Sequence, residues 1–95
     1  MMRVDFQDSA SALTLRVEGR LVGTSAEELR NLVAHGKLPP RLVVDLSDVT
    51  FVDDLGEQML SWLGRIGTEF VAESSYPRDV CERLHLLLVD DRTLP

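Results

Sequence analysis

The stretch Leu42–Gly56, LVVDLSDVTFVDDLG, decides the fold that we expect for this chain. It opens with three β-favouring apolar residues in a row, a pattern typical of a strand that is buried on both faces. It closes with two aspartates and a glycine, directly before apolar residues at helical spacing. The sequence therefore predicts a central strand over residues 41–46 and a helix that begins near Asp54.

The predicted helix after the central strand runs to about residue 66, and Gly67 ends it. Its inward-facing residues would lie three or four positions apart, at Met59, Leu60, Leu63 and Ile66. This spacing indicates an amphipathic helix that packs one stripe against a sheet.

Two strands are expected before the central one. Over residues 12–18 apolar and polar residues alternate, which is typical of a half-buried strand. Val4 and Phe6 alternate with charged residues and predict a short edge strand. The turn at residues 8–11 can join the two strands as a hairpin.

A helix is expected between this hairpin and the central strand. Thr24 or Ser25 can cap its N-terminus, because each has a glutamate three residues later, the spacing of a capping box. Gly36 is placed to end the helix in a left-handed conformation, and Pro39 and Pro40 prevent its continuation. The residues that would face the sheet are Ala26, Leu29, Leu32 and Val33.

The last third of the chain predicts one more strand, helix and strand. Residues 70–72 are short and β-favouring, and Ser75 can cap a helix that tolerates Pro77 in its first turn. The inward residues of that helix would be Val80, Cys81 and Leu84, and residues 86–89 predict the final strand.

The predicted order of elements is β-β-α-β-α-β-α-β. Helical connections between consecutive strands produce a mostly parallel sheet with right-handed crossovers. We therefore expect a single α/β domain over residues 1–95, with four to five strands and with helices mainly on one face of the sheet. The length agrees, because 95 residues make one domain of ordinary size.

The charge of the chain limits its partners. Sixteen acidic and ten basic residues give a net charge of −6, which would repel nucleic acids and anionic membrane surfaces. No apolar stretch is long enough to span a bilayer, the first residues do not form a secretory signal, and the single cysteine favours a reducing compartment. We expect a cytoplasmic protein with a protein partner, without nucleic-acid binding or membrane insertion.

Two motifs resemble the STAS family, which is named after sulfate transporters and anti-sigma-factor antagonists. The family's usual pattern is a buried strand ending in Asp-Leu-Ser, then Val-x-Phe-x-Asp-Ser-(Ser/Thr)-Gly at the start of a helix. Leu42–Gly56 is similar to this pattern, and Val17–Leu21 is similar to the x-x-Gly-x-Leu that precedes the family's first helix. The resemblance covers nearly the whole chain and implies a STAS fold with a non-catalytic, protein-binding role. The family's final helix is not expected, because only residues 91–95 follow the last predicted strand.

The chain departs from the family at the phosphorylation site. The resemblance implies that a partner kinase phosphorylates the serine directly after the motif's aspartate. That position is Asp54 here, and the following Ser/Thr position is Leu55. A serine kinase therefore has nothing to modify at this site, unless Ser47 or Thr50 has become the acceptor. Two interpretations of Asp54 stay open: a helix cap as good as serine, or a cap that also imitates phosphoserine and locks the switch.

The start of the second helix is also the predicted partner-binding surface. This surface combines the turn before the first helix with the motif itself, namely Gly23, Thr24, Asp53, Asp54, Leu55, Gly56 and Glu57. Glu57 stands where the antagonists usually carry an apolar residue, so three carboxylates surround one helix start and could meet Arg or Lys on a partner. Acidic residues are common in a first helical turn, so we expect no metal site and no cofactor.

No catalytic arrangement is expected either. His35 and His85 have no Gly-x-Ser-x-Gly elbow to serve, and Cys81 falls on an apolar helix face, where a buried thiol is inert. We expect a bacterial signalling protein of transcription regulation that resembles anti-sigma-factor antagonists and binds an anti-sigma-factor or serine-kinase-like protein. The alternative is an accessory subunit that grips the ATPase of a lipid ABC transporter.

Overall fold

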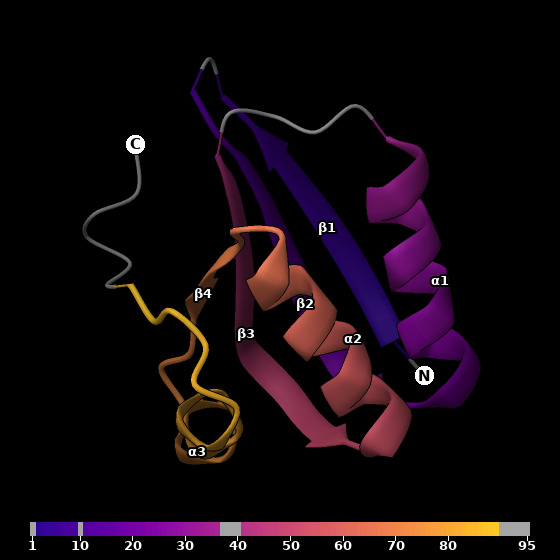
Figure 1. The fold of residues 1–95 in the computed structure, drawn as a ribbon, viewed down its shortest axis with the longest axis vertical. Coiled ribbons are helices and arrows are strands. Elements are labelled where there is room, and N and C mark those ends of the chain that lie inside the picture. The colour runs from indigo at the N-terminus through magenta and orange to yellow at the C-terminus, as the bar shows by residue number, and fades with distance from the viewer. Residues whose placement is uncertain (1, 10, 37–40, 90–95) are drawn as a thin grey trace.

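The structure, a computed structural model, describes residues 2–9, 11–36 and 41–89. The elements are β1 (Met2–Asp8), β2 (Leu13–Leu21), α1 (Gly23–His35), β3 (Leu42–Val52), α2 (Asp54–Arg65), β4 (Glu69–Val71) and α3 (Ser75–Arg83) (Figure 1). The four strands form one sheet in the order β1-β2-β3-β4, with β1 antiparallel to β2 and the other pairs parallel. The predicted mostly parallel α/β sheet is confirmed.

The helices α1 and α2 cover one face of the sheet, and α3 lies beside β3 (Figure 1). β4 pairs only with residues 43–45 of β3, which leaves the rest of that strand's edge to α3. The Tyr76 hydroxyl accepts a hydrogen bond from the backbone N–H of Val52 at 2.8 Å. The Ser74 hydroxyl donates to the Ser47 carbonyl, and the Ser47 Oγ accepts from the Glu73 N–H. These bonds occupy backbone groups that β4 does not reach.

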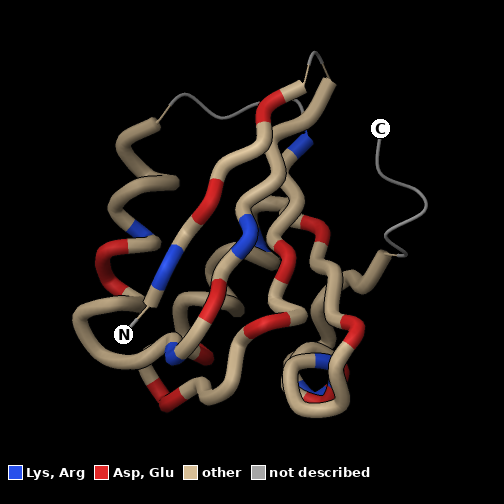
Figure 2. Tube along the Cα trace, turned by 180° about the vertical axis from the view of Figure 1, so that it is seen from behind, with Lys and Arg blue, Asp and Glu red and all other residues tan. Residues whose placement is uncertain are grey.

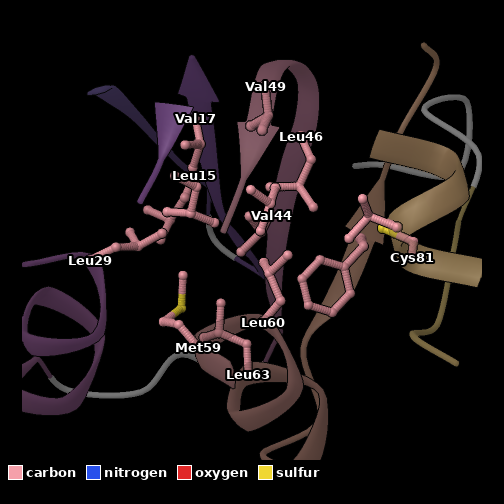
Figure 3. Packing of buried hydrophobic residues seen from close by; sticks show 14 of the residues in the cluster. Leu15, Val17, Leu29, Val44, Leu46, Val49, Met59, Leu60, Leu63 and Cys81 are labelled. Atoms are coloured by element: carbon pink, nitrogen blue, oxygen red, sulfur yellow. The ribbon is translucent and has the colours of Figure 1, made fainter. Parts of the chain in front are cut away.

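The core lies between the sheet and the two helices on its covered face. Side chains of α1 and α2 point toward those of β2 and β3, and Cys81 of α3 lies at the far side of the cluster (Figure 3). Burying one Leu or Val side chain in such a core contributes about 1.5–3 kcal/mol. The central members are at most 4% exposed: Leu15, Val17, Leu29, Val44, Leu46, Val49, Met59, Leu60, Leu63 and Cys81.

Charged residues of both signs lie along the strands of the sheet, as the view from behind shows (Figure 2). The Arg16 guanidinium contacts the Asp48 carboxylate at 2.6 Å, and Arg41 contacts Glu69 at the same distance. The hydrogen bonds from Arg41 hold the pKa of Glu69 below its ordinary value. An exposed ion pair such as that of Arg16 with Asp48 contributes little to stability, so burial against α1 and α2 is the main source of order in the sheet.

β3 continues six residues beyond its predicted end at residue 46. The register against β2 shifts between Arg16 and Glu18 and again between Gly19 and Arg20, because β3 carries an extra residue at each place. Such bulges break the two-residue period of a strand. Leu46, Val49 and Val52 are therefore all buried although they lie three positions apart. The prediction ended the strand too early because it relied on simple alternation.

The start and end of α1 differ from the prediction. The helix begins at Gly23 after Val22, and neither Thr24 nor Ser25 caps it, so the predicted capping box is wrong. Gly36 has φ −85° and ψ 161°, which is extended backbone and not the left-handed conformation expected. Leu32, predicted to face inward, is 51% exposed, because the stripe that contacts the sheet contains only Ala26, Leu29 and Val33. Pro39 and Pro40 lie outside the described residues.

The later elements follow the prediction more closely. α2 begins at Asp54, and Gly67 follows it with φ +92°, as expected of a residue that ends a helix. Ile66 is 39% exposed and not inward, since the helix has already ended there. Ser74, not Ser75, precedes α3. The predicted last strand is reduced to one parallel bridge between Phe70 and Leu88 within the described residues, and residues 91–95 lie outside them.

Candidate functional site

Asp53 is the one residue between the end of β3 and the start of α2. Its backbone is extended, with φ −91° and ψ −174°, and its Oδ1 accepts a hydrogen bond from the Gly56 N–H at 2.8 Å. Asp53 is thus the N-cap of α2, an arrangement that satisfies one of the unpaired donors at a helix start. Its Oδ2 accepts a second bond, at 3.0 Å, from the N–H of Gly23 at the start of α1. One carboxylate therefore serves two helices.

Gly56 allows α2 to start directly against the end of β2. A Cβ atom at this position would lie 2.3 Å from the Leu21 carbonyl oxygen and 2.7 Å from Val52 Cγ1. Neither backbone nor core can move away easily, so no larger residue fits without displacing the helix. This close approach explains why a glycine stands three residues after the capping aspartate.

Asp54 and Leu55 form the exposed part of the same helix start. Both are exposed, Leu55 by 53%. The Asp54 side chain makes no hydrogen bond or ion pair with the described residues, so the interpretation of Asp54 as the helix cap is wrong, and Asp53 takes that role. Asp54 is in the first turn, where a negative charge favours the helix dipole.

Glu57 contacts α3 of the same chain. The Arg83 guanidinium donates two hydrogen bonds to its carboxylate, at 3.0 and 2.7 Å. These bonds lower the pKa of Glu57 more than partial burial raises it. The three carboxylates of the motif therefore differ: Asp53 bonds backbone, Glu57 is paired with Arg83, and Asp54 faces solvent. Residues 2–9, 11–36 and 41–89 contain no group of three or more His, Cys, Asp or Glu side chains that could hold a metal ion.

A groove of about 750 Å³ lies between α1 and α2, and several residues of the predicted partner-binding surface line it. Its lining includes Gly23, Asp54, Leu55 and Glu57 of that surface, and Thr24 is exposed next to Gly23. Arg30 of α1, which also lines the groove, was not predicted to belong to the site. The Arg30 guanidinium of α1 lies 5.0 Å from the centre of the Trp62 ring of α2, a cation–π contact across the groove. No sequence pattern pairs these two residues, because only the packing of α1 against α2 brings them together.

The remaining candidates lie apart from this groove. Ser47 Oγ accepts the Glu73 N–H, and the exposed Thr50 hydroxyl donates to the Gly19 carbonyl at 3.2 Å. Cys81 is buried, and desolvation raises its pKa to about 11, so the thiol is inert at neutral pH. Among the described helices, none is long and apolar enough to cross a membrane.

The solved structures similar to this chain include several anti-sigma factor antagonists. No family model matches the sequence, and no curated protein matches it significantly. An anti-sigma factor antagonist from Mycobacterium paratuberculosis has a TM-score of 0.74 at 25% identity, over 100% of this chain and 84% of that one. The antisigma-factor antagonist STAS domain from Rhodobacter sphaeroides has a TM-score of 0.55 at 26% identity, over 73% and 82%. The anti-sigma factor antagonist SpoIIAA in its unphosphorylated form has a TM-score of 0.64 at 16% identity, over 95% and 88%.

The chain therefore has the STAS fold of the anti-sigma factor antagonists, and the resemblance seen in its motifs is confirmed. The shared feature is a four-stranded mixed sheet with three helices. A fold by itself does not establish what a protein binds, so the function depends on the residues of the site.

Proposed function

We propose that this chain is a non-catalytic protein-binding module that docks through the starts of α1 and α2. The observation that carries the proposal is the exposed pair Asp54 and Leu55 directly after the capping Asp53. In the antagonists that the chain resembles, the position of Asp54 carries the regulatory serine. An apolar side chain beside an unpaired carboxylate offers a partner both an anchor and a charge to recognise.

We further propose that the serine-phosphorylation switch is lost or locked at this position. Asp54 has no hydroxyl to accept a phosphate, and it carries a carboxylate in its place. It imitates phosphoserine only in part, with one charge against about 1.5 to 2 and two acceptor oxygens against three. Because Asp53 caps the helix, a change at Asp54 alters the charge of the surface without removing the cap bond.

Two substitutions at this position test the proposal. The protein that wild-type chain captures from its native host is purified, and its binding to Asp54→Ser and Asp54→Asn is measured by titration calorimetry. Stronger binding of both variants would mean that Asp54 acts as a permanent block, as a phosphate would. Binding weakened by about 1 kcal/mol or more would mean that a cation on the partner pairs with Asp54. Unchanged binding in both would contradict a role for this residue.

The matched control for this experiment is Asp79→Asn. Asp79 is an exposed aspartate on α3, away from the groove, and its substitution removes the same charge from the protein. It should leave binding unchanged. Thermal stability should change by less than about 1 kcal/mol in all three variants, because none loses a helix cap.

Phosphate incorporation gives an independent test. Wild-type chain incubated with ATP and a related serine kinase should not be labelled, and Asp54→Ser should be labelled if the kinase still docks. Stoichiometric labelling of the wild type, mapped by mass spectrometry to Ser47 or Thr50, would show that the acceptor had moved and would overturn the lost switch.

A further inference from the structure

Asp53 differs from the other residues of the predicted surface because its carboxylate accepts backbone N–H groups from two helices. Its Oδ1 accepts the Gly56 N–H of α2 and its Oδ2 accepts the Gly23 N–H of α1, thirty residues away in sequence. Its backbone N–H donates to the Leu21 carbonyl at the end of β2, at 3.3 Å. The residue is half-buried, and both carboxylate oxygens are engaged.

The start of α1 depends on this contact more than the start of α2 does. Val22 and the residues after it make no side-chain cap bond for α1. Gly23 has φ +46°, and a Cβ atom there would have no neighbour within 4 Å, in contrast to the close approach at Gly56. The backbone N–H of Ser25 donates to the Val22 carbonyl at 2.9 Å, which is part of the helix itself. Among the described residues, the bond to Asp53 is the one side-chain hydrogen bond that a backbone N–H of this turn makes.

We infer that Asp53 is a positioning residue that holds the first turns of α1 and α2 together as one surface. It was expected to contact a partner, and its bonds instead assign it to the scaffold beneath that surface. The inference rests on the proposed function, because Gly23 and Thr24 matter for docking only if a partner contacts both helix starts. Loss of one carboxylate oxygen should then release α1 while α2 keeps its cap.

Replacing Asp53 with asparagine should remove the bond to the Gly23 N–H and keep the bond to the Gly56 N–H. An asparagine side chain has one acceptor oxygen, and its NH₂ group only donates. It is as good an N-cap as aspartate, so its oxygen should keep the bond to the Gly56 N–H. Its NH₂ group would then face the Gly23 N–H, donor against donor, and the tie to α1 would be lost.

Amide hydrogen exchange of the free protein, followed by NMR, measures how the variant affects the Gly23 and Gly56 amides separately. In Asp53→Asn, exchange at Gly23 should accelerate about tenfold or more relative to the core amides of Val44 and Leu60, as expected when a charge-assisted hydrogen bond is lost. Exchange at Gly56 should stay in step with the core. In the matched control Asp54→Asn, neither glycine should change. Equal acceleration at every amide, or none at Gly23, would overturn the inference.

A second variant keeps the test open if Asp53→Asn does not fold. The serine of Asp53→Ser also caps helices, but its side chain is shorter and has a single acceptor oxygen. It should produce the same split between Gly23 and Gly56. In wild-type protein, a through-hydrogen-bond NMR coupling between the Asp53 carboxyl carbon and the Gly56 nitrogen, without one to the Gly23 nitrogen, would also overturn the inference.

Binding to the captured partner protein separates this inference from the proposed function. Asp53→Asn should weaken that binding about tenfold, the loss expected when half of the docking surface becomes mobile. If it binds like wild type while Gly23 is released, the start of α1 is not part of the surface and the positioning role is wrong, although docking through α2 stands. If wild type captures no partner, the proposed function fails, and the exchange experiment alone decides whether Asp53 couples the two helices.

Discussion

The two helices that meet at Asp53 begin in different ways. α2 begins with its own N-cap, and Gly56 presses its first turn against the Leu21 carbonyl. α1 begins at Gly23 with no side-chain cap of its own, and a Cβ at this first residue would meet no atom within 4 Å. The first start is fixed by neighbours in sequence and by packing, and the second by a single side chain from a distant strand end. We therefore expect substitutions at the start of α2 to cost more stability than equivalent ones at α1.

The largest expected effect is that of Gly56→Ala. The new Cβ would collide with the Leu21 carbonyl oxygen and with Val52, which should lower the free energy of unfolding by about 3 kcal/mol. Gly64→Ala is the matched control, because it lies in the same helix and its Cβ meets only the mobile end of Leu86. It should change stability by less than about 1 kcal/mol. Urea denaturation followed by circular dichroism measures both, and similar values for the two would contradict the close approach.

Asp53→Ala should have the next largest effect. It removes the cap of α2 and the tie to α1 together, so the free energy of unfolding should fall by about 2 kcal/mol. Asp53→Asn should cost about half as much, since it keeps the cap. The same urea titration tests this order, and an equal loss in the two variants would mean that the bond to Gly23 contributes nothing.

Gly23→Ala should cost about 1 kcal/mol, clearly less than the same change at Gly56. Nothing would collide with the new methyl group, so the penalty comes only from placing alanine at φ +46°. Thermal unfolding of the two glycine variants side by side measures the difference. If Gly23→Ala were as damaging as Gly56→Ala, the start of α1 would be packed as tightly as that of α2, and the proposed difference between the two helix starts would be wrong.

Glu57→Gln should have the smallest effect, and one that depends on pH. Arg83 lowers the pKa of Glu57 in the folded chain, so the carboxylate stabilises the fold above the ordinary pKa of 4.5. That stabilisation is lost as the pH falls through the lowered value. The variant should therefore be slightly less stable than wild type at pH 7 and equal to it in strong acid. Glu27→Gln, an exposed glutamate on α1, should show no such convergence in thermal melts from pH 7 to pH 2.

The fold and the start of α2 could be predicted from sequence because their signals are local. Asp54, the apolar spacing after it and Gly67 define α2, and the three apolar residues at the start of β3 are all buried. The end of β3 could not be predicted, because two bulges replace the alternation on which strand prediction depends.

The parts of the site that were missed all involve contacts between distant elements. The cap of α1 comes from Asp53, and Glu57 is paired with Arg83 instead of facing a partner. The contact of Arg30 with Trp62 likewise exists only once α1 and α2 pack together. A single sequence carries no local signal for any of these pairs.

Asp53 and Asp54 have different structural roles, and this difference determines which mutations the chain can tolerate. Position 53 holds backbone donors from two helices, so most replacements there lower stability and would be removed by selection. Position 54 holds nothing in place within the described chain, so serine, threonine, asparagine or aspartate can stand there at almost equal folding cost. A lineage with this architecture can gain or lose an acceptor hydroxyl in one substitution while staying above the stability threshold that folding demands.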